Sequence, residues 1–227
     1  MIFTYQNAFL KKSLRRGWQV FKEVCSACHG IELIAYRNLV GTILTEEEAK
    51  EEASKVEIVD GPDDTGAMFE RPGKLSDYIP SPYANENAAR AANNGGYPPD
   101  LSVIIKARHG GADYVFSLLT GYKNPPVGVE IREGLHYNPY FQGGAISMAQ
   151  ALSNDMIEYE DGTEATVSQL SKDVVHFLQW TAEPEHDVRK LTGIKVMGAL
   201  VFMSVATWYH KKVRWSVIKT RKVKFFK

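Results

Sequence analysis

Both cysteines of this 227-residue chain lie in one stretch of five residues, Cys25-Ser26-Ala27-Cys28-His29. A thioredoxin-type dithiol would need a β-α-β pattern around the two thiols, and the neighbouring sequence does not have one. A zinc site would need two further ligands at a matching spacing, but there is no second cysteine pair and the other histidines are scattered. Neither of these two chemistries therefore suits the stretch.

Covalent attachment of a c-type haem fits the same spacing. Two thiols one helical turn apart can reach the two vinyl groups of haem, and a histidine directly after them lies beneath the iron. The sequence thus predicts thioether bonds from Cys25 and Cys28 and axial ligation by His29. With both thiols used, the chain has no cysteine left for another role.

The sixth iron ligand has several candidates. Outside the first residue and the apolar C-terminal segment, the methionines are Met68, Met148 and Met156. Met148 is preferred, because Gly143 and Gly144 before it allow the backbone to approach a haem face closely. The alternatives are an ordinary core methionine at 148 and ligation by His109 or His136. Methionine would raise the reduction potential relative to a second histidine.

The two propionates of a haem also need partners, because burying a carboxylate requires cationic or hydroxyl donors. Arg108, at the end of one apolar segment, and Tyr114, one turn into the next, are well placed by sequence to supply them. The alternatives are a surface salt bridge for Arg108 and an ordinary core position for Tyr114.

The formal net charge of zero is the sum of an acidic part, residues 1–210, and a basic part, residues 211–227. Residues 211–227 hold eight Lys or Arg and no acid, whereas residues 1–210 hold 19 basic and 27 acidic residues. Such an asymmetry between parts of a chain indicates a partner or a surface for the basic end.

An apolar run lies just before the basic end. Residues 194–209 contain a single charge, Lys195, and are shorter than the roughly 20 residues of an average spanning helix. Lys195 and Lys211 can extend to the membrane surface, and three aromatic residues suit its interface: Trp208, Tyr209 and Trp215. A buried core helix is the alternative. The many following cations favour a membrane anchor whose basic tail lies on the positive-inside face.

Helical periodicity and capping signals predict a mainly α fold. The expected helices cover residues 13–24 with Ser13 as N-cap, 45–56 after a Thr45/Glu48 capping box, 86–92, 101–108 with Asp100 as N-cap, 113–120 ending at Gly121, and 168–182. Residues 157–160 and 163–167 alternate like a hairpin, and most of 60–99 and 124–145 is expected to be loop. We expect the first of these helices to cross the last.

Several long blocks occur in a recognisable order. They are CSACH, RPGKLSDY, NNGGYPPDLSVIIKARHGGADYVFSLLTGY, EGLHYNPYFQGGAISM and TAEPEHDVRK followed by the apolar run. From about Arg16 to the end, the chain resembles the cytochrome c1 family, the haem subunits of quinol–cytochrome c oxidoreductase (bc1 complex). The resemblance implies a class I cytochrome c-like haem domain with long loop insertions plus one C-terminal transmembrane helix. The implied domains are a haem domain over 1–190, an anchor over 191–210 and a matrix-side tail over 211–227.

The resemblance also implies a residue set for one covalent haem c. The thioether and axial positions are Cys25, Cys28, His29 and Met148. The propionates would be approached by Asn93, Arg108 and Tyr114, with the Pro98-Pro99 turn as a wall of the haem pocket. One departure is that Gln142 and residues 149–151 stand where relatives usually carry prolines, so we expect a less rigid ligand loop.

Members of the family accept one electron from the Rieske iron–sulfur protein and pass it to soluble cytochrome c. The resemblance implies this role as an electron-transfer subunit without catalytic residues of its own. Its partners would be cytochrome b, other complex III subunits and the membrane in a dimeric complex, with no nucleic acid. The haem domain would face the intermembrane space, with the anchor in the mitochondrial inner membrane and the C-terminus in the matrix.

Two other functions remain open from the residues. A stand-alone membrane-anchored c-type cytochrome feeding an oxidase would share the haem motif and the anchor. A haem-based sensor or peroxidase would need an open sixth position at the iron.

Overall fold

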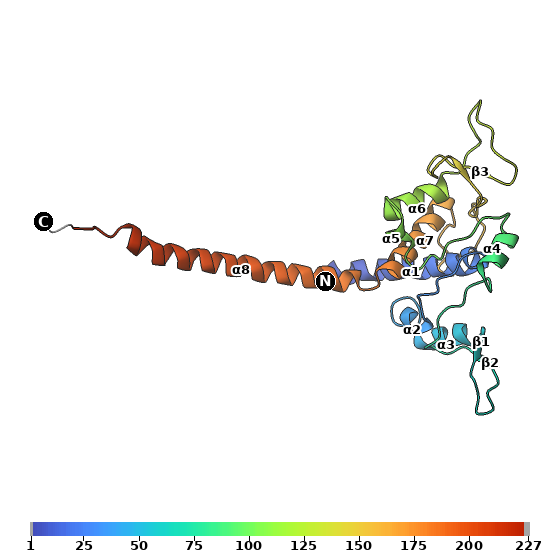
Figure 1. Ribbon diagram of the computed structural model, residues 1–227, viewed down its shortest axis with the longest axis horizontal. Helices are drawn as coiled ribbons and strands as arrows, with labels where there is room; N and C mark the ends of the chain where they lie inside the picture. The colour runs from blue at the N-terminus through green and yellow to red at the C-terminus, as the bar shows by residue number, and fades with distance from the viewer. Residues whose placement is uncertain (1, 225–227) are drawn as a thin grey trace. The chain divides into compact units, whose positions relative to one another are not determined.

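The computed structural model describes residues 2–224, with side chains from residue 11 onward (Figure 1). It consists of two compact units, Met1–Glu183 and Pro184–Lys227. The first unit is built mainly of helices with short strands, and the second contains one long helix, α8 (His186–Lys219). The expected mainly α fold with one long apolar C-terminal helix is confirmed.

The helices of the first unit vary greatly in length. They are α1 (Ile2–Glu23), α2 (Tyr36–Leu39), α3 (Glu46–Ser54), α4 (Glu86–Ala92), α5 (Ile104–Ala107), α6 (Gly111–Thr120) and α7 (Val167–Ala182). Two antiparallel hairpins accompany them: β1 (Glu57–Asp60) with β2 (Phe69–Pro72), and β3 (His136–Tyr137) with β4 (Ala145–Ile146). In register, Glu57 lies opposite Pro72 and His136 lies opposite Ile146.

Most of the predicted helices are confirmed. α3 begins with the expected capping box, in which the Glu48 amide donates to Thr45 Oγ1 at 3.2 Å and the Thr45 amide donates to Glu48 Oε2 at 2.8 Å. α4 covers the predicted residues 86–92, and Asn85 caps its N-terminus. α6 ends at Gly121 as expected, and α7 begins after Thr166, which caps it.

Two helix starts were predicted wrongly. α1 begins at Ile2 rather than at Ser13, whose hydroxyl instead donates to Asp173 Oδ1 at 2.6 Å on the neighbouring helix. Asp100 does not cap a helix either, because its two carboxylate oxygens accept from the amides of Ser102 and Glu32. The helix after it, α5, is therefore delayed to Ile104 and is only four residues long.

The hairpin predicted at residues 157–167 is also wrong. This segment is a turn in which Asp161 Oδ1 accepts from the Thr163 amide at 3.1 Å, with no strand among its described residues. A hairpin forms instead at β1 and β2, where no strand was predicted and where β2 lies in a stretch expected to be mostly loop. Its base is tied by Arg71, which forms ion pairs with Asp60 and Asp77.

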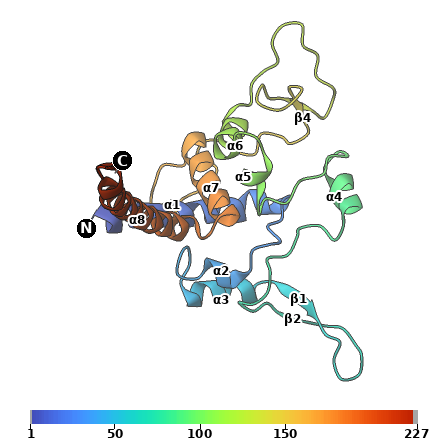
Figure 2. The same ribbon diagram turned by 60° about the vertical axis from the view of Figure 1, so that its left-hand side comes forward.

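The core is centred on the packing of α1 against α7, which cross in Figure 2 as the sequence predicts. Gly17 marks the closest approach, because a Cβ there would overlap the backbone carbonyl of Asp173 and the Cβ of Phe177. Beside it, the rings of Trp18, Phe21 and Phe177 lie 5.6 to 6.0 Å apart. Such aromatic contacts add to the area that the crossing buries.

A buried ion pair lies at the same crossing. Asp173 is fully buried, and Arg16 contacts both of its oxygens, with Nε donating to Oδ2 at 2.7 Å and a second nitrogen donating to Oδ1 at 3.2 Å. Ser13 and Gln169 supply two further donors. Because the Ser13 hydroxyl gives its proton to the carboxylate, the 2.9 Å contact from His176 Nδ1 must be a donation to Ser13 Oγ. The buried charge is thus fully hydrogen-bonded.

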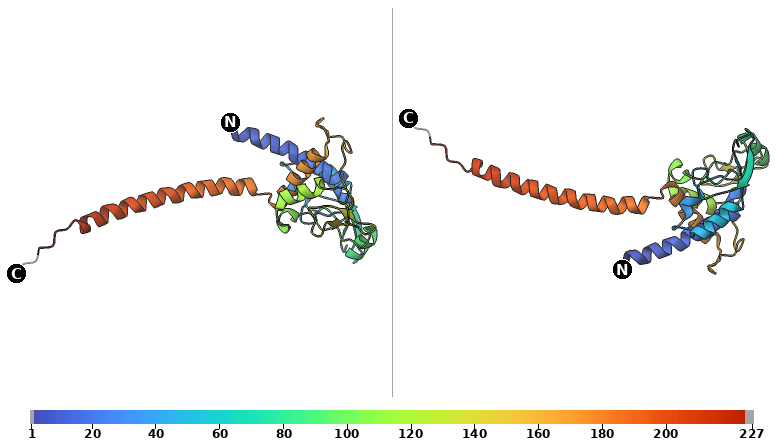
Figure 3. Two further views of the ribbon diagram at one scale, coloured as in Figure 1. Left: turned by 90° about the horizontal axis from the view of Figure 1, so that it is seen from above. Right: turned by 90° about the horizontal axis from the view of Figure 1, so that it is seen from below.

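α8 forms the second unit. It is a single helix of 34 residues without interruption (Figure 3), and it would be about 51 Å long at the usual rise per residue. Within the described residues it is the one helix long and apolar enough to cross a membrane. Lys212 Nζ lies 5.3 Å from the centre of the Trp208 ring, a cation–π pair one turn apart at the end of the apolar run.

The buried ion pair gives the first testable prediction. Asp173→Asn leaves Asp161 as the carboxylate that still pairs with the Arg16 guanidinium. It also turns one acceptor oxygen into an NH2 group, which faces the N–H and O–H donors that now bond the carboxylate. We expect a loss of about 3 kcal/mol in the free energy of unfolding. The measurement is a urea titration of the detergent-solubilised protein followed by circular dichroism.

Glu46→Gln is the matched control, since Glu46 forms an exposed ion pair with Lys50 inside α3. This variant should unfold at the same urea concentration as the parent. An equal, small effect of both substitutions would show that the buried pair does not hold the crossing.

Candidate functional site

The Cys25–Cys28 stretch directly follows α1. A 3-10 turn covers Cys25–Ala27, and the amides of Cys28 and His29 both donate to the Cys25 carbonyl, at 3.1 and 2.9 Å. Both cysteines are free thiols. Burial raises the pKa of Cys25 to about 12, so this sulfur is a neutral thiol at physiological pH. The end of α1 thus presents two half-buried thiols and one imidazole within a single tight turn.

The His29 ring is held in one orientation. Its Nδ1 lies 2.7 Å from the backbone carbonyl of Pro99. A carbonyl oxygen only accepts, so Nδ1 carries the proton and Nε2 keeps a free lone pair. Burial lowers the pKa of His29, which keeps the ring neutral. A neutral imidazole with its Nδ1–H on a backbone carbonyl is the usual state of a histidine that ligates a metal through Nε2.

The Pro99 carbonyl is itself fixed by a set of cross-links between two segments. The Leu101 amide donates to the Gly30 carbonyl at 2.8 Å. The Glu32 amide donates to Asp100 Oδ2 at 2.8 Å, and the Leu33 amide donates to the fully buried Ser102 Oγ at 3.1 Å. These three bonds hold residues 30–33 against residues 100–102, and so hold the carbonyl against the imidazole.

The residues expected near the propionates lie on other elements. Asn93 ends α4, where its amide donates to the Ala89 carbonyl at 2.7 Å and to the Tyr83 hydroxyl at 3.0 Å. Arg108 follows α5 and is exposed, and Tyr114 is half-buried in α6 against the core. No hydrogen bond joins these three to His29 in the described part of the chain, so their propionate contacts stay predictions.

The three methionine candidates differ in exposure. Met68 and Met156 are 61% and 44% exposed, whereas Met148 is half-buried two residues after β4. The alternative histidine ligands, His109 and His136, are both exposed. A thioether that ligates iron must be shielded from water, so Met148 keeps the better position.

Two side chains that sequence reasoning missed fix the surroundings of Met148. The Tyr122 hydroxyl donates to the Met148 carbonyl at 2.9 Å, and the fully buried Asn138 donates through Nδ2 to the Leu118 carbonyl at 2.8 Å. The Asn138-Pro139 pair signals a turn in the sequence, but nothing marks Tyr122. Both contacts are to backbone oxygens far away in sequence, which no local pattern reveals.

The chemistry of this donor set suits one metal-bearing cofactor rather than a bare ion. Among the described side chains no group of three or more His, Cys, Asp or Glu could hold a metal ion. Two thiols and one imidazole in a single turn are too few for a zinc site, yet they are the complete protein side of a covalent haem attachment. The residues present therefore fit a c-type haem.

Comparison with known proteins agrees with this chemistry. The sequence profile of the Cytochrome C1 family matches residues 3–218. The chain belongs to this family. It is 58% identical to the mitochondrial haem protein cytochrome c1 2 of Arabidopsis thaliana, over 93% of this chain and 69% of the relative.

Two fungal relatives are similar to the same degree. The mitochondrial cytochrome b-c1 complex catalytic subunit of Candida albicans is 58% identical over 99% of this chain and 77% of its own length. The mitochondrial haem protein cytochrome c1 of Saccharomyces cerevisiae is 57% identical, over 96% and 71%. The resemblance stated from the sequence blocks is thus confirmed at the level of the family.

The cross-links behind His29 give the second prediction. Asp100→Ala removes the acceptor of two backbone amides, those of Glu32 and Ser102. We expect a loss of about 2 kcal/mol in the free energy of unfolding and faster hydrogen exchange confined to residues 30–33 and 100–102. Exchange monitored by mass spectrometry on the haem-loaded protein measures both regions.

Asp64→Ala serves as the control, because Asp64 is an exposed aspartate in the β1–β2 loop. Its exchange pattern around His29 should match the parent. Unchanged exchange in Asp100→Ala would mean that the two segments are held together by other contacts.

Proposed function

We propose that this chain is a one-electron carrier that holds one covalent haem c and acts as the haem subunit of a cytochrome bc1 complex. The observation that carries the proposal is the neutral His29 imidazole, with Nδ1–H on the Pro99 carbonyl and a free Nε2, next to two free thiols. That arrangement supplies an axial ligand of fixed direction beside both attachment points.

The residues that would hold the group are Cys25 and Cys28 through thioethers, His29 and Met148 at the iron, and Asn93, Pro99, Arg108 and Tyr114 around it. Haem iron supplies a reversible one-electron change when it is bound. The protein's part is to keep the imidazole neutral, exclude water and tune the potential. No acid, base or nucleophile is required of this chain, so its enzymatic role is that of a subunit in the complex.

Two observations support the inferred electron donor and acceptor, namely the similarity to a named relative and the charge of residues 1–210. The relative from Candida albicans is named as a subunit of the cytochrome b-c1 complex. In this chain, residues 1–210 carry eight more acids than bases. An acidic surface steers a basic soluble carrier into a productive encounter at a high, salt-sensitive rate. We infer that the Rieske protein donates the electron and that soluble cytochrome c accepts it, with cytochrome b and other complex III subunits as neighbours in a dimer.

The membrane arrangement is inferred from α8. Its apolar run is followed by a basic end, and cations next to a spanning helix favour the positive-inside face. We therefore infer an anchor over residues 191–210 in the mitochondrial inner membrane. Residues 1–190 would face the intermembrane space, and residues 211–227 would lie in the matrix.

The third prediction tests the ligand set. Met148→Leu should lower the midpoint potential of the haem, since loss of the thioether removes the ligand that favours ferrous iron. The variant should also bind carbon monoxide in the ferrous state, which six-coordinate iron resists. Redox titration and the ferrous spectrum under carbon monoxide measure the two effects.

Met156→Leu is the control, because Met156 is also outside the anchor but is 44% exposed. It should leave the potential and the carbon monoxide response unchanged. A parent protein that already binds carbon monoxide would favour a haem sensor or peroxidase with an open sixth position.

The fourth prediction separates a complex subunit from a stand-alone anchored cytochrome. The chain, tagged at its N-terminus and extracted from mitochondrial membranes in mild detergent, should co-purify with cytochrome b and the Rieske protein. Absorption spectra of the purified material should show b-type and c-type haem together. A chain that elutes alone, with c-type haem only, would support the stand-alone carrier instead.

A further inference from the structure

The backbone around Met148 is held by very little regular structure. β4 ends at Ile146, and the described residues between it and α7 form no helix or strand. Ile146 and Leu152 are buried, with 6% and 2% of their surface exposed, and they anchor the two ends of the segment. Between them Ala149 and Gln150 are exposed. A local hydrogen bond runs from Gln150 Nε2 to the Leu152 carbonyl at 3.0 Å.

One long-range hydrogen bond reaches this segment at Met148 itself. The Tyr122 hydroxyl donates to the Met148 carbonyl at 2.9 Å across 26 residues of sequence. The Met148 carbonyl oxygen can only accept, so the Tyr122 hydroxyl is the donor in this contact. The contact fixes the peptide group that carries the Met148 side chain.

The backbone at Tyr122 is held in place by its neighbours. It directly follows Gly121, the residue that ends α6, and the next amide, that of Lys123, points to the Tyr137 carbonyl at 3.5 Å. The fully buried Asn138 closes the loop onto the same helix, because its side-chain Nδ2 donates to the Leu118 carbonyl at 2.8 Å. The chain between α6 and β4 therefore leaves the end of one helix and returns to it (Figure 2).

We propose that Tyr122 is a positioning residue for the sixth iron ligand, and that its bond to the Met148 carbonyl holds the Met148 sulfur against displacement from the iron. This inference rests on the proposed function, in which Met148 is that ligand. It also accounts for how a loop with alanine and glutamine at positions 149–151 keeps a defined ligand position without prolines.

The physical reason is the flexibility of methionine. Its side chain has three rotatable bonds, so the side chain alone does not fix where the sulfur lies. A fixed peptide group removes backbone motion and leaves only side-chain rotation. When the hydroxyl is absent, the segment between Ile146 and Leu152 gains freedom, and the ligand-dissociated state becomes more populated. An added ligand that competes for the iron detects that state.

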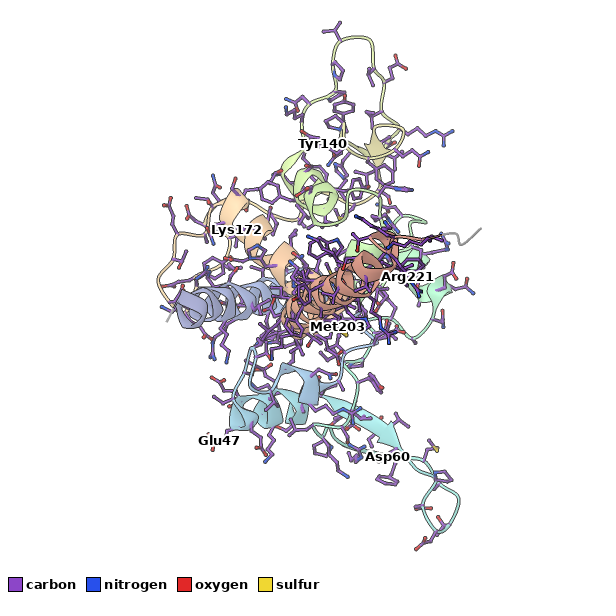
Figure 4. All side chains as sticks on the ribbon, turned by 90° about the vertical axis from the view of Figure 1, so that its left-hand side faces the viewer. Glu47, Asp60, Tyr140, Lys172, Met203 and Arg221 are labelled. Atoms are coloured by element: carbon purple, nitrogen blue, oxygen red, sulfur yellow. The ribbon has the colours of Figure 1, made fainter. Side chains whose placement is uncertain are left out.

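The experiment compares Tyr122→Phe with Tyr140→Phe in the haem-loaded, detergent-solubilised complex. Both variants lose one hydroxyl and keep the ring. Tyr140 lies beside α6 (Figure 4), is 53% exposed, and its hydroxyl makes no hydrogen bond to a described residue. The probe is imidazole, titrated against the ferric protein while the sulfur-to-iron charge-transfer band is recorded.

In Tyr122→Phe we expect the apparent affinity for imidazole to rise roughly fivefold, which corresponds to the loss of one neutral hydrogen bond. The midpoint potential should fall and the haem content should stay unchanged, while loss of the same bond lowers the urea midpoint only slightly. Tyr140→Phe should match the parent in every readout. An effect on unfolding without an effect on imidazole affinity would assign Tyr122 a merely structural role and overturn the proposal.

Met148→Leu separates this inference from the proposed function. If Met148→Leu abolishes the sulfur-to-iron band while Tyr122→Phe leaves imidazole affinity unchanged, the carrier function stands and the positioning role is overturned. If Met148→Leu keeps the band, another residue ligates the iron. In that case the ligand assignment and the role of Tyr122 are overturned together.

Discussion

The contact on which the haem-bearing unit depends is the crossing of α1 and α7 at Gly17. Only a residue without a Cβ lets the backbone of α1 approach the Asp173 carbonyl this closely. The same crossing buries the Asp173 carboxylate, which is tolerated because four donors surround it. Glycine sets the distance between the helices, and the Arg16–Asp173 pair sets their register. Both together place the end of α1 relative to α7, and therefore place the turn that carries the two thiols and the imidazole.

Beyond the end of α1, backbone amides and carbonyls determine the geometry of the site. The turn at Cys25–Ala27 places His29, and a carbonyl from residue 99 selects which ring nitrogen carries the proton. The Asp100 carboxylate accepts from the Glu32 amide of the opposing segment and from the Ser102 amide of its own segment. The Ser102 hydroxyl accepts from the Leu33 amide, so these groups hydrogen-bond backbone amides rather than the imidazole. The site thus presents the His29 imidazole in a neutral form, the form that metal ligation through Nε2 requires.

The parts of the fold that the sequence predicts are those in which one local signal decides the structure. The Thr45/Glu48 capping box, the Gly121 stop and the apolar stripe of α7 are such cases. The β1–β2 hairpin escaped prediction because neither of its faces is fully buried, so it lacks an alternating apolar pattern. At 157–167 the alternation reflects burial of Tyr159 and Ala165 in the core rather than strand pairing. A side chain that bonds a residue far away in sequence, as Tyr122 does, produces no periodic pattern from which it could be predicted. The CxxCH stretch could be interpreted because all of its functional groups lie within five consecutive residues.

The residues that hold the helices together and those that surround Met148 belong to different parts of the unit. Arg16 and Asp173 lie in the α1–α7 crossing. Tyr122, just after α6, donates to the Met148 carbonyl, and Asn138, just after β3, donates to the Leu118 carbonyl of α6. Well-separated groups without shared partners contribute almost independently to stability. A change at Tyr122 can therefore alter the exchange of Met148, the proposed iron ligand, without loosening the crossing that positions His29. In the proposed ligand set the two axial positions are separately adjustable, because the Pro99 carbonyl orients the His29 ring and the Tyr122 hydroxyl restrains the backbone at Met148.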